Sequence, residues 1–278
     1  MRRHSFSGPI VRIPQRFVRT AIHPDYVDGM WIFVSIRFSK RLLLLDEPRE
    51  GFLRTLVYLG GYCTLEQAQK LGLANSPTRV AAQLQVLKNA GFLRQIANYP
   101  VIHQVTKSAT RLIGVDLMAR RRHTSPTIRC KLLGVNFYLE AKAWPAEFTF
   151  AHSEKITVLN AAGCPTDALP HVGGHPYLWQ EFLLRRADGK VCIAAVDRPE
   201  NTPKYQTRTL TERYGGVLEC LPAEFRLIVV VGSEGRARLY RKWAAQPIAG
   251  RFTQHTLKPY QVRTPIPQVN ISLEEKQQ

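Results

Sequence analysis

Residues 49–114 have the sequence REGFLRTLVYLGGYCTLEQAQKLGLANSPTRVAAQLQVLKNAGFLRQIANYPVIHQVTKSATRLIG, and the fold prediction starts from them. Their first apolar residues recur at helical spacing up to Gly60-Gly61, which predicts a helix that ends there. Thr64 is a good N-cap, and Gln67 three residues later completes the pattern of a capping box. We therefore expect a short second helix over residues 65–71, ending at Gly72.

A third helix is predicted to begin at Ser76-Pro77, because serine is a favoured N-cap and proline fits the first helical position. This helix is expected to end at Gly91. One of its faces is apolar and packs inward, whereas the other presents polar side chains to solvent. The inward residues are Val80, Leu84 and Leu87, and the outward residues are Thr78, Arg79, Gln83, Gln85 and Lys88.

After the third helix the pattern changes to strands. Phe92-Leu93 begins a strand, and residues 94–106 are typical of a two-stranded hairpin that turns near Asn98-Tyr99-Pro100. Residues 106–114 then predict one more helix. Three helices followed by a hairpin indicate a winged helix-turn-helix, a fold whose second paired helix lies in the major groove of duplex DNA.

The chain carries a large positive charge. It has 39 lysines and arginines against 21 acidic residues, which gives a formal net charge of +18. Residues 49–114 contain eight basic and two acidic residues, a surplus of six. Such a surplus favours nucleic acid as a partner, because binding releases counterions from the phosphates. A solvated basic surface and an anionic lipid surface are the alternatives.

We expect double-stranded DNA as the partner, bound through base-edge contacts and phosphate contacts. The base-edge candidates are Thr78, Arg79, Gln83 and Gln85; the phosphate candidates are Lys88 and Arg94; the candidates in or beside the hairpin are Asn98, His103 and Lys107; and a basic cluster at the junction with the next domain contains Arg120, Arg121 and Arg122.

The sequence favours a reducing compartment without a membrane partner. The longest apolar run near the start, residues 42–45, is too short to cross a bilayer, and the apolar stretch of a signal peptide is missing. The five cysteines are scattered without metal-type spacing, which is typical of free thiols in the cytoplasm. We therefore expect a cytoplasmic protein with no resident metal and no cofactor.

The composition divides the chain into four parts. Residues 1–48 are a basic arm followed by a strand-like segment, which forms either a hairpin on the next domain or an arm that pairs with a partner chain. Residues 49–118 are the winged helix-turn-helix. Residues 119–246 form a second domain, and residues 247–278, which contain several prolines, are expected to be an extended or disordered tail.

The second domain mixes helices and strands, so the fold class is α+β: a winged helix-turn-helix followed by a small mixed α/β domain. Asp188-Gly189 lies between two apolar runs and predicts a hairpin. The expected elements are a helix from Ser125, a strand at 147–150, a helix at 153–161, strands at 182–186 and 191–196, a helix at 204–214, a buried strand at 225–231, and a helix or hairpin over 236–243.

Three motifs in this region are informative together. They are Pro165-Thr166-Asp167-Ala168, then Ala195-Val196-Asp197-Arg198-Pro199-Glu200-Asn201, then a basic helix that ends in Tyr214. With these motifs, residues 49–243 resemble the replication-relaxation family, accessory proteins of plasmids and integrative elements. The resemblance implies a role in plasmid replication, DNA relaxation or conjugative mobilisation. It also implies a second domain similar to the core of PD-(D/E)XK nucleases, which are restriction-endonuclease-like.

The sequence departs from that family at two positions that bear on catalysis. Thr166 separates the Pro-Asp pair, and Ala195 stands where the family has Glu. Metal-dependent phosphodiester cleavage needs converging carboxylates around Mg²⁺, and usually a nearby lysine. Asp167 and Asp197, with Glu181 as a third acid, are therefore weak catalytic candidates. We expect a degenerate nuclease-like core, with Mg²⁺ required only if the nuclease alternative holds.

The interpretation is a DNA-binding accessory protein of a plasmid or mobile element, whose winged helix binds duplex DNA in support of replication, relaxation, mobilisation or related processing. A transcriptional regulator, a metal-dependent nuclease and a structural subunit of a larger DNA-processing complex are the alternatives. The further partners that these interpretations allow are other DNA-processing proteins and a second copy of the chain in a homodimer.

Overall fold

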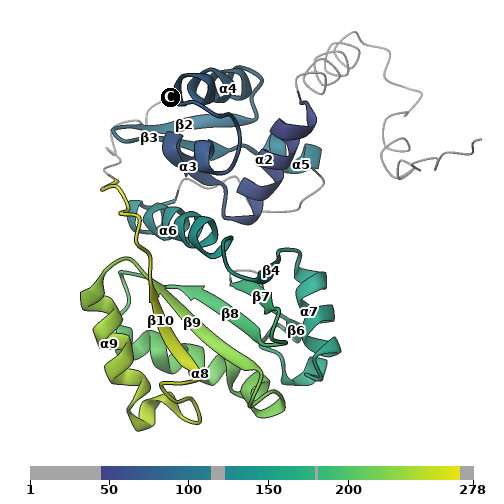
Figure 1. Ribbon diagram of the computed structural model, residues 1–278, viewed down its shortest axis with the longest axis vertical. Helices are drawn as coiled ribbons and strands as arrows, with labels where there is room; N and C mark the ends of the chain where they lie inside the picture. The colour runs from purple at the N-terminus through teal and green to yellow at the C-terminus, as the bar shows by residue number, and fades with distance from the viewer. Residues whose placement is uncertain (1–44, 114–122, 179–180, 270–278) are drawn as a thin grey trace, which may run out of the picture. The chain divides into compact units, whose positions relative to one another are not determined.

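The first part of the described chain combines short helices with a small sheet (Figure 1). The computed structural model describes residues 45–113, 123–178 and 181–269. The sheet has the strand order β1-β3-β2, and β3 is antiparallel to both neighbours. The elements are α2 (Glu47–Tyr58), β1 (Tyr62–Thr64), α3 (Leu65–Lys70), α4 (Pro77–Asn89), β2 (Leu93–Asn98), β3 (Val101–Val105) and α5 (Lys107–Ile113).

Side-chain caps fix where α3 and α4 begin. Thr64 forms the predicted capping box: its Oγ1 accepts a hydrogen bond from the Gln67 amide, and Gln67 Oε1 accepts one from the Thr64 amide. Ser76 accepts a hydrogen bond from the Arg79 amide, with Pro77 in the first turn. Both predicted helix starts are confirmed.

The inward face of α4 packs as predicted. Val80, Leu84 and Leu87 are buried. They share one apolar core with Leu53 and Leu56 of α2. Fully burying a side chain of this size stabilises the fold by about 1.5–3 kcal/mol, so this core holds the helices together.

The second part contains a five-stranded mixed sheet in the order β10-β9-β8-β7-β4 (Figure 1). Strands β8, β9 and β10 are parallel, and β7 is antiparallel to β8 and β4. The elements are α6 (Ser125–Ala141), β4 (Ala146–Thr149), α7 (His152–Ala161), η2 (Thr166–Ala168), β5 (His171–Val172), β6 (His175–Pro176), β7 (Phe182–Arg186), β8 (Val191–Val196), α8 (Pro203–Cys220), β9 (Phe225–Val231), α9 (Glu234–Ala244), η3 (Pro247–Ala249) and β10 (Leu257–Gln261).

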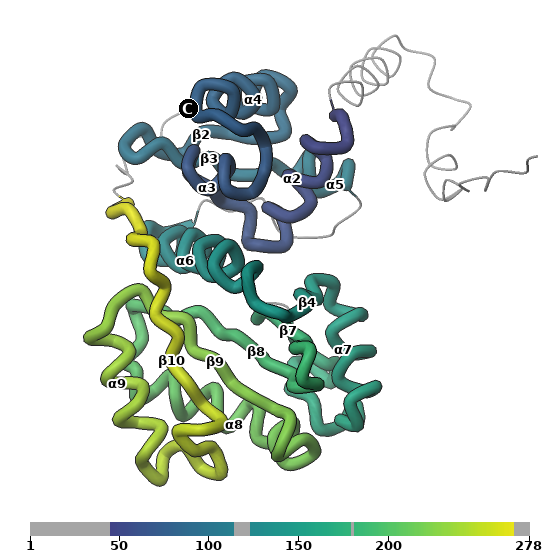
Figure 2. Tube along the Cα trace, in the orientation of Figure 1, coloured from purple at the N-terminus to yellow at the C-terminus, as the bar shows by residue number. Residues whose placement is uncertain are grey.

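Helices cover both faces of this sheet. Because successive side chains of a strand point to opposite sides, neighbouring residues of β8 lie in different cores. Ile193 of β8 packs in the core that contains Leu210 of α8 and Tyr240 of α9. The next residue, Ala194, packs in the core that contains Phe137 of α6. The continuous apolar run of β8 is therefore buried on both sides, as its sequence predicts. Figure 2 traces the two crossovers, through α8 and through α9, that make β8, β9 and β10 parallel.

Helix α6 also contacts the first part of the chain. Gln67 Nε2 donates hydrogen bonds to the Leu132 carbonyl at 2.9 Å and to Asn136 Oδ1 at 2.6 Å. Tyr62 packs with Leu132 in a shared apolar cluster. The described residues, 45–113, 123–178 and 181–269, lie in one compact unit.

The segment predicted to be a tail from residue 247 contributes a strand to the sheet. Strand β10 pairs in parallel with β9, and both Leu257 and Val262 are buried. Pro259 lies within β10, an edge strand, where the missing N–H of proline is tolerated. Prolines in this segment therefore do not indicate an unstructured chain, and that part of the prediction is wrong.

Helix α8 continues six residues past its predicted end at Tyr214. The sequence favours a stop there because Gly215-Gly216 follows. A Cβ at position 216 would lie 2.6 Å from the Ala168 carbonyl oxygen. Gly216 therefore lets η2 approach the helix closely, and its role is packing rather than termination.

Several predictions fall on residues outside the described ranges. These are the arm and strand-like segment up to residue 44, the basic cluster Arg120, Arg121 and Arg122, and the last residues, 270–278. Among the helices that the structure describes, none combines the length and apolar character needed to span a bilayer.

Candidate functional site

The outward face of α4 is the candidate nucleic-acid interface. Thr78, Arg79 and Gln85 are exposed on it, as predicted. The helix contains no acidic residue. Its N-terminal turn adds the partial positive charge of the helix dipole. This face can therefore attract a polyanion.

Two predicted contact residues of α4 already bind neighbouring elements. Gln83 is half-buried, and its Oε1 accepts a hydrogen bond from Arg49 Nε of α2 at 2.6 Å. Lys88 Nζ lies 3.4 Å from Gln95 Oε1 of β2, a long contact. The Gln83 side chain thus links α4 to α2 and is not free to contact a base edge in this structure. Lys88 stays a phosphate candidate.

The hairpin formed by β2 and β3 presents polar side chains beside α4. Arg94 and Asn98 are exposed, and Arg94 Nε donates to Gln104 Oε1 at 2.9 Å. Lys107, in the first turn of α5, is half-buried. Tyr99 at the turn is 91% exposed. The sequence predicts the turn at Tyr99 but gives no reason to include its ring among the contacts.

His103 is removed from the interface by its position in the sheet. It lies in the central strand β3, opposite Cys63 on one side and Gln95 on the other, and is 6% exposed. Burial, assisted by the charge of Lys88, lowers the pKa of its imidazole. A neutral ring inside the sheet cannot contact a phosphate, so the predicted role of His103 is wrong.

Asp197, a predicted catalytic carboxylate, follows β8 directly and is buried. Arg236 of α9 binds it through two hydrogen bonds, from Nε to Oδ2 at 2.7 Å and from Nη2 to Oδ1 at 2.5 Å. The Tyr240 hydroxyl donates to the same Oδ1 at 2.6 Å. Burial and the Asp197 charge raise the pKa of Tyr240, so its hydroxyl keeps the proton. Three donors thus occupy the carboxylate that a metal would need.

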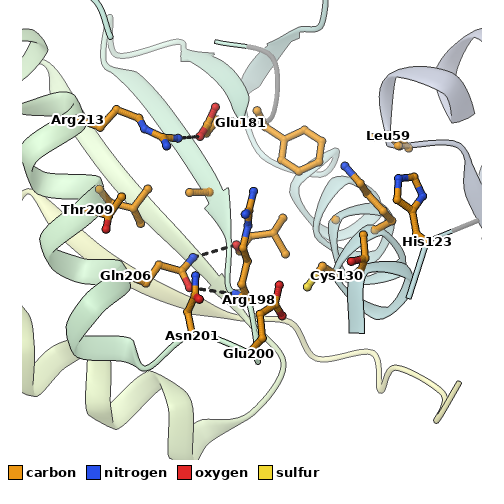
Figure 3. A pocket seen from close by; sticks show the side chains of 18 of the residues that line it. Leu59, His123, Cys130, Glu181, Arg198, Glu200, Asn201, Gln206, Thr209 and Arg213 are labelled. Atoms are coloured by element: carbon orange, nitrogen blue, oxygen red, sulfur yellow. Dashed lines mark hydrogen bonds and ion pairs between the residues drawn. The ribbon is translucent and has the colours of Figure 1, made fainter. Parts of the chain in front are cut away.

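Arg236 also fixes the loop that follows Asp197. Its Nη2 donates to the carbonyl oxygens of Arg198 at 3.2 Å and Asn201 at 3.0 Å. Gln206 of α8 accepts a hydrogen bond from the Arg198 amide at 3.0 Å, as Figure 3 shows. The loop is therefore held from both sides, and the Arg198 side chain is presented from a fixed backbone.

Asp167, the second predicted carboxylate, does not meet Asp197. It is exposed on η2, which packs beside Gly216 in the second half of α8. The hydrogen bonds around Asp197 reach Gln206, in the first half of the same helix. Ten residues of helix separate these two points, a distance of about 15 Å. The described residues also contain no group of three or more side chains placed to hold a metal ion.

A pocket of about 370 Å³ lies at the carboxyl end of β8 (Figure 3). It is bounded by α6, the loop after Asp197, the first half of α8 and the end of α2. Four cationic side chains and two carboxylates line it: Lys131, Lys155, Arg198 and Arg213, with Glu181 and Glu200.

One end of the pocket contains an ordered set of charges. Arg213 Nη1 donates to Glu181 Oε1 at 2.8 Å, and Glu181 is 6% exposed. Lys155 Nζ donates to the carbonyls of Leu178 at 2.9 Å and Glu181 at 2.7 Å, and burial lowers the pKa of Lys155 to about 8. Burial and the nearby Glu181 carboxylate raise the pKa of Tyr214. Glu181, the third predicted acid, thus belongs to this pocket.

The sequence did not predict the pocket, because its charged residues come from elements far apart in the chain. One pattern was available. Lys155 and Leu159 are four residues apart and both buried, so the lysine lies on the inward face of α7. A lone lysine at an apolar position of a helix indicates a buried cation that needs partners.

No protein-family model, no curated protein and no solved structure matches this chain. The resemblance to the replication-relaxation family therefore stays a prediction, supported by the motifs alone.

Proposed function

We propose that this chain is a DNA-binding accessory protein of a plasmid or other mobile element. In this proposal α2 to α5, with β1 to β3, form a winged helix-turn-helix. Helix α4 enters the major groove, and the β2–β3 hairpin is the wing. The observation that carries the proposal is the exposed, acid-free face of α4 with Thr78, Arg79 and Gln85. The link to mobile elements rests on the sequence motifs.

The hairpin beside α4 and the charge of the chain support the same partner. Arg94 and Tyr99 are exposed on the hairpin beside α4. The net charge of +18 supplies salt-dependent affinity for any duplex. Specificity would come from the side chains of α4 that reach base edges.

In the same proposal the α/β part is a nuclease-like core without cleavage chemistry. Its mixed sheet between helices supports the resemblance to such a core. The ion pair that holds Asp197, and the exposed position of Asp167 on η2, argue against a metal-dependent nuclease. Support of DNA processing would then come from binding, without Mg²⁺.

Selection from a random pool of duplexes tests the proposal. The protein is expected to enrich a duplex and to bind it less tightly as salt rises. Supercoiled plasmid incubated with the protein and Mg²⁺ or Mn²⁺ is expected to stay intact. Failure to enrich any duplex, or binding that does not depend on salt, would overturn duplex binding, and nicking would establish the nuclease instead.

A transcriptional regulator is the second candidate, because a pocket of ligand size adjoins Leu59 and Gly60 at the end of α2. A reporter fused to the protein's own promoter, compared with a plasmid-transfer assay, separates these functions. Repression that responds to a small molecule, without an effect on transfer, would favour the regulator.

A further inference from the structure

The pocket at the carboxyl end of β8 has unbalanced charge. Among the described residues that line it, four cationic side chains face two carboxylates, a surplus of two positive charges. A phosphate monoester carries about −1.5 to −2 charges at neutral pH. An anion of that kind would neutralise the pocket.

Lys131 is the least compensated of these cations. Its stem crosses Gly60, where an added Cβ would lie 2.5 Å from Lys131 Cδ. The described part of the chain gives its Nζ no hydrogen bond and no ion pair, and its strongest charged neighbour is the Arg198 guanidinium. Burial and that like charge lower the pKa of Lys131. Two neighbouring cations in a half-buried pocket favour an anion between them.

Arg198 is presented to the pocket by a backbone that is already ordered. Arg236 holds the carbonyl of Arg198, and Gln206 holds its amide. Figure 3 shows Arg198 and Glu200 at one end of the pocket, and Glu181 with Arg213 at the other. A fixed loop reduces the entropy lost when a ligand binds.

Aromatic rings supply a second kind of contact in the same pocket. Tyr58 and Phe150 stack with ring centroids 5.4 Å apart and planes 19° from parallel. Tyr205, which also lines the pocket, is 60% exposed. Aromatic faces hold nucleobases by stacking. The volume, about 370 Å³, is that of a small-ligand site.

We propose that this pocket binds a nucleoside 5′-monophosphate, with the phosphate between Lys131 and Arg198 and the base against the aromatic rings. The nucleotide comes either free from solution or as the 5′ end of a DNA strand, since both have the same phosphate and base. The site is distinct from the outward face of α4 and goes beyond the duplex-binding function.

Isothermal titration calorimetry on the full chain tests the proposal. The probes are the four deoxynucleoside 5′-monophosphates, the matching nucleosides and inorganic phosphate. At least one monophosphate is expected to bind, about tenfold or more tighter than its nucleoside and than phosphate, because each of those lacks one set of contacts. Equal binding of nucleotide and nucleoside, or no binding by any nucleotide, would overturn the proposal.

Matched variants locate the site. Lys131→Met keeps an apolar stem over Gly60 and is expected to weaken nucleotide binding about tenfold or more. Lys142→Met, at the exposed end of the same helix, is the control and is expected to change it less than about twofold. Arg198→Gln gives the same test from a loop side chain if Lys131→Met fails to fold. Wild-type affinity in the folded variants would contradict the assignment.

Two further measurements separate the sources and the sites. The first compares dTMP with a four-nucleotide strand that carries either a 5′-phosphate or a 5′-hydroxyl. If only the 5′-phosphate strand binds more tightly than dTMP, the pocket is assigned to a strand end. Equal or weaker binding of that strand assigns it to free nucleotide. Arg79→Ala is expected to bind nucleotide like the wild type, so failure of the pocket proposal and failure of duplex binding through α4 give different results.

Discussion

Arg236 and Asp197 form a two-bonded ion pair between α9 and the end of β8, with N–O distances of 2.7 and 2.5 Å. The same guanidinium reaches the carbonyls of Arg198 and Asn201. The acid that sequence motifs place at a catalytic position therefore orders a loop. That loop carries Arg198, one of the cations of the pocket.

Asp197→Ala is expected to destabilise the protein by roughly 2–4 kcal/mol, because it leaves a partly buried guanidinium without its counter-charge. The free energy of unfolding in urea measures this. Asp167→Ala is the matched control, since Asp167 is exposed on η2. Its expected effect is within about 0.5 kcal/mol. Equal effects of the two substitutions would refute the structural role of Asp197.

Two glycines, Gly51 inside α2 and Gly60 just after it, are expected to respond oppositely to alanine. Gly51 is exposed inside the helix with open space around it, so Gly51→Ala is expected to stabilise by about 0.5–1 kcal/mol. Gly60 has a φ of +102° and contacts the Lys131 stem, so Gly60→Ala is expected to destabilise by roughly 1–3 kcal/mol. Thermal unfolding measures both, and a stabilising Gly60→Ala would contradict the geometry.

Gln67→Leu is expected to destabilise by about 1–3 kcal/mol, because Asn136 Oδ1 and the Thr64 amide both lose their buried partner. Gln69→Leu on the same helix is the control, since its side chain makes one long, exposed hydrogen bond to the Asn75 carbonyl. Adding Asn136→Leu to the first variant is expected to recover part of the loss. Similar unfolding midpoints for the two single variants would exclude this contribution of Gln67.

The stability of the protein is expected to depend on pH through Lys155. Its folded-state pKa, about 8, lies below that of a lysine in an unfolded chain, about 10.4. Between these values the unfolded chain binds more protons, so the free energy of unfolding rises with pH. The free energy of unfolding of the wild type minus that of Lys155→Met is therefore expected to increase from pH 7.5 to pH 9.5. A difference that stays flat or shrinks over this range would show that the ammonium is not buried.

Local patterns predicted the starts and the buried faces of several helices and strands. The capping box at Thr64, the Ser76-Pro77 start and the inward face of α4 each depend on residues close together in the chain, and each was predicted correctly. Strand β10 and the last turns of α8 were not. The local sequence predicts that regular structure is interrupted at Pro259 and Gly216. The pairing of β10 with β9 and the packing of η2 on α8 show why both residues are tolerated.

In the candidate sites, too, local sequence predicts the exposure of a side chain but not its contacts with residues far away in the chain. The exposure of Arg79 follows from helix periodicity alone. The partner of Gln83 is 34 residues away in the chain, and that of Asp197 is 39 residues away, so neither sequence position shows that the side chain is occupied. The sequence around His103 is that of an ordinary hairpin strand. It does not show that a third strand, β1, pairs with β3 and makes it the central strand of the sheet.

Recognition through α4 is tested by the affinity of the Arg79→Ala variant for the selected duplex, measured by fluorescence anisotropy beside the Arg251→Ala variant. Arg251 is an exposed arginine paired with Glu219, so it matches the charge change outside α4. Arg79→Ala is expected to lose about 1–3 kcal/mol of binding free energy, and Arg251→Ala is expected to bind nearly as the wild type does. Unchanged binding by Arg79→Ala, or an equal loss in both variants, would contradict recognition through α4.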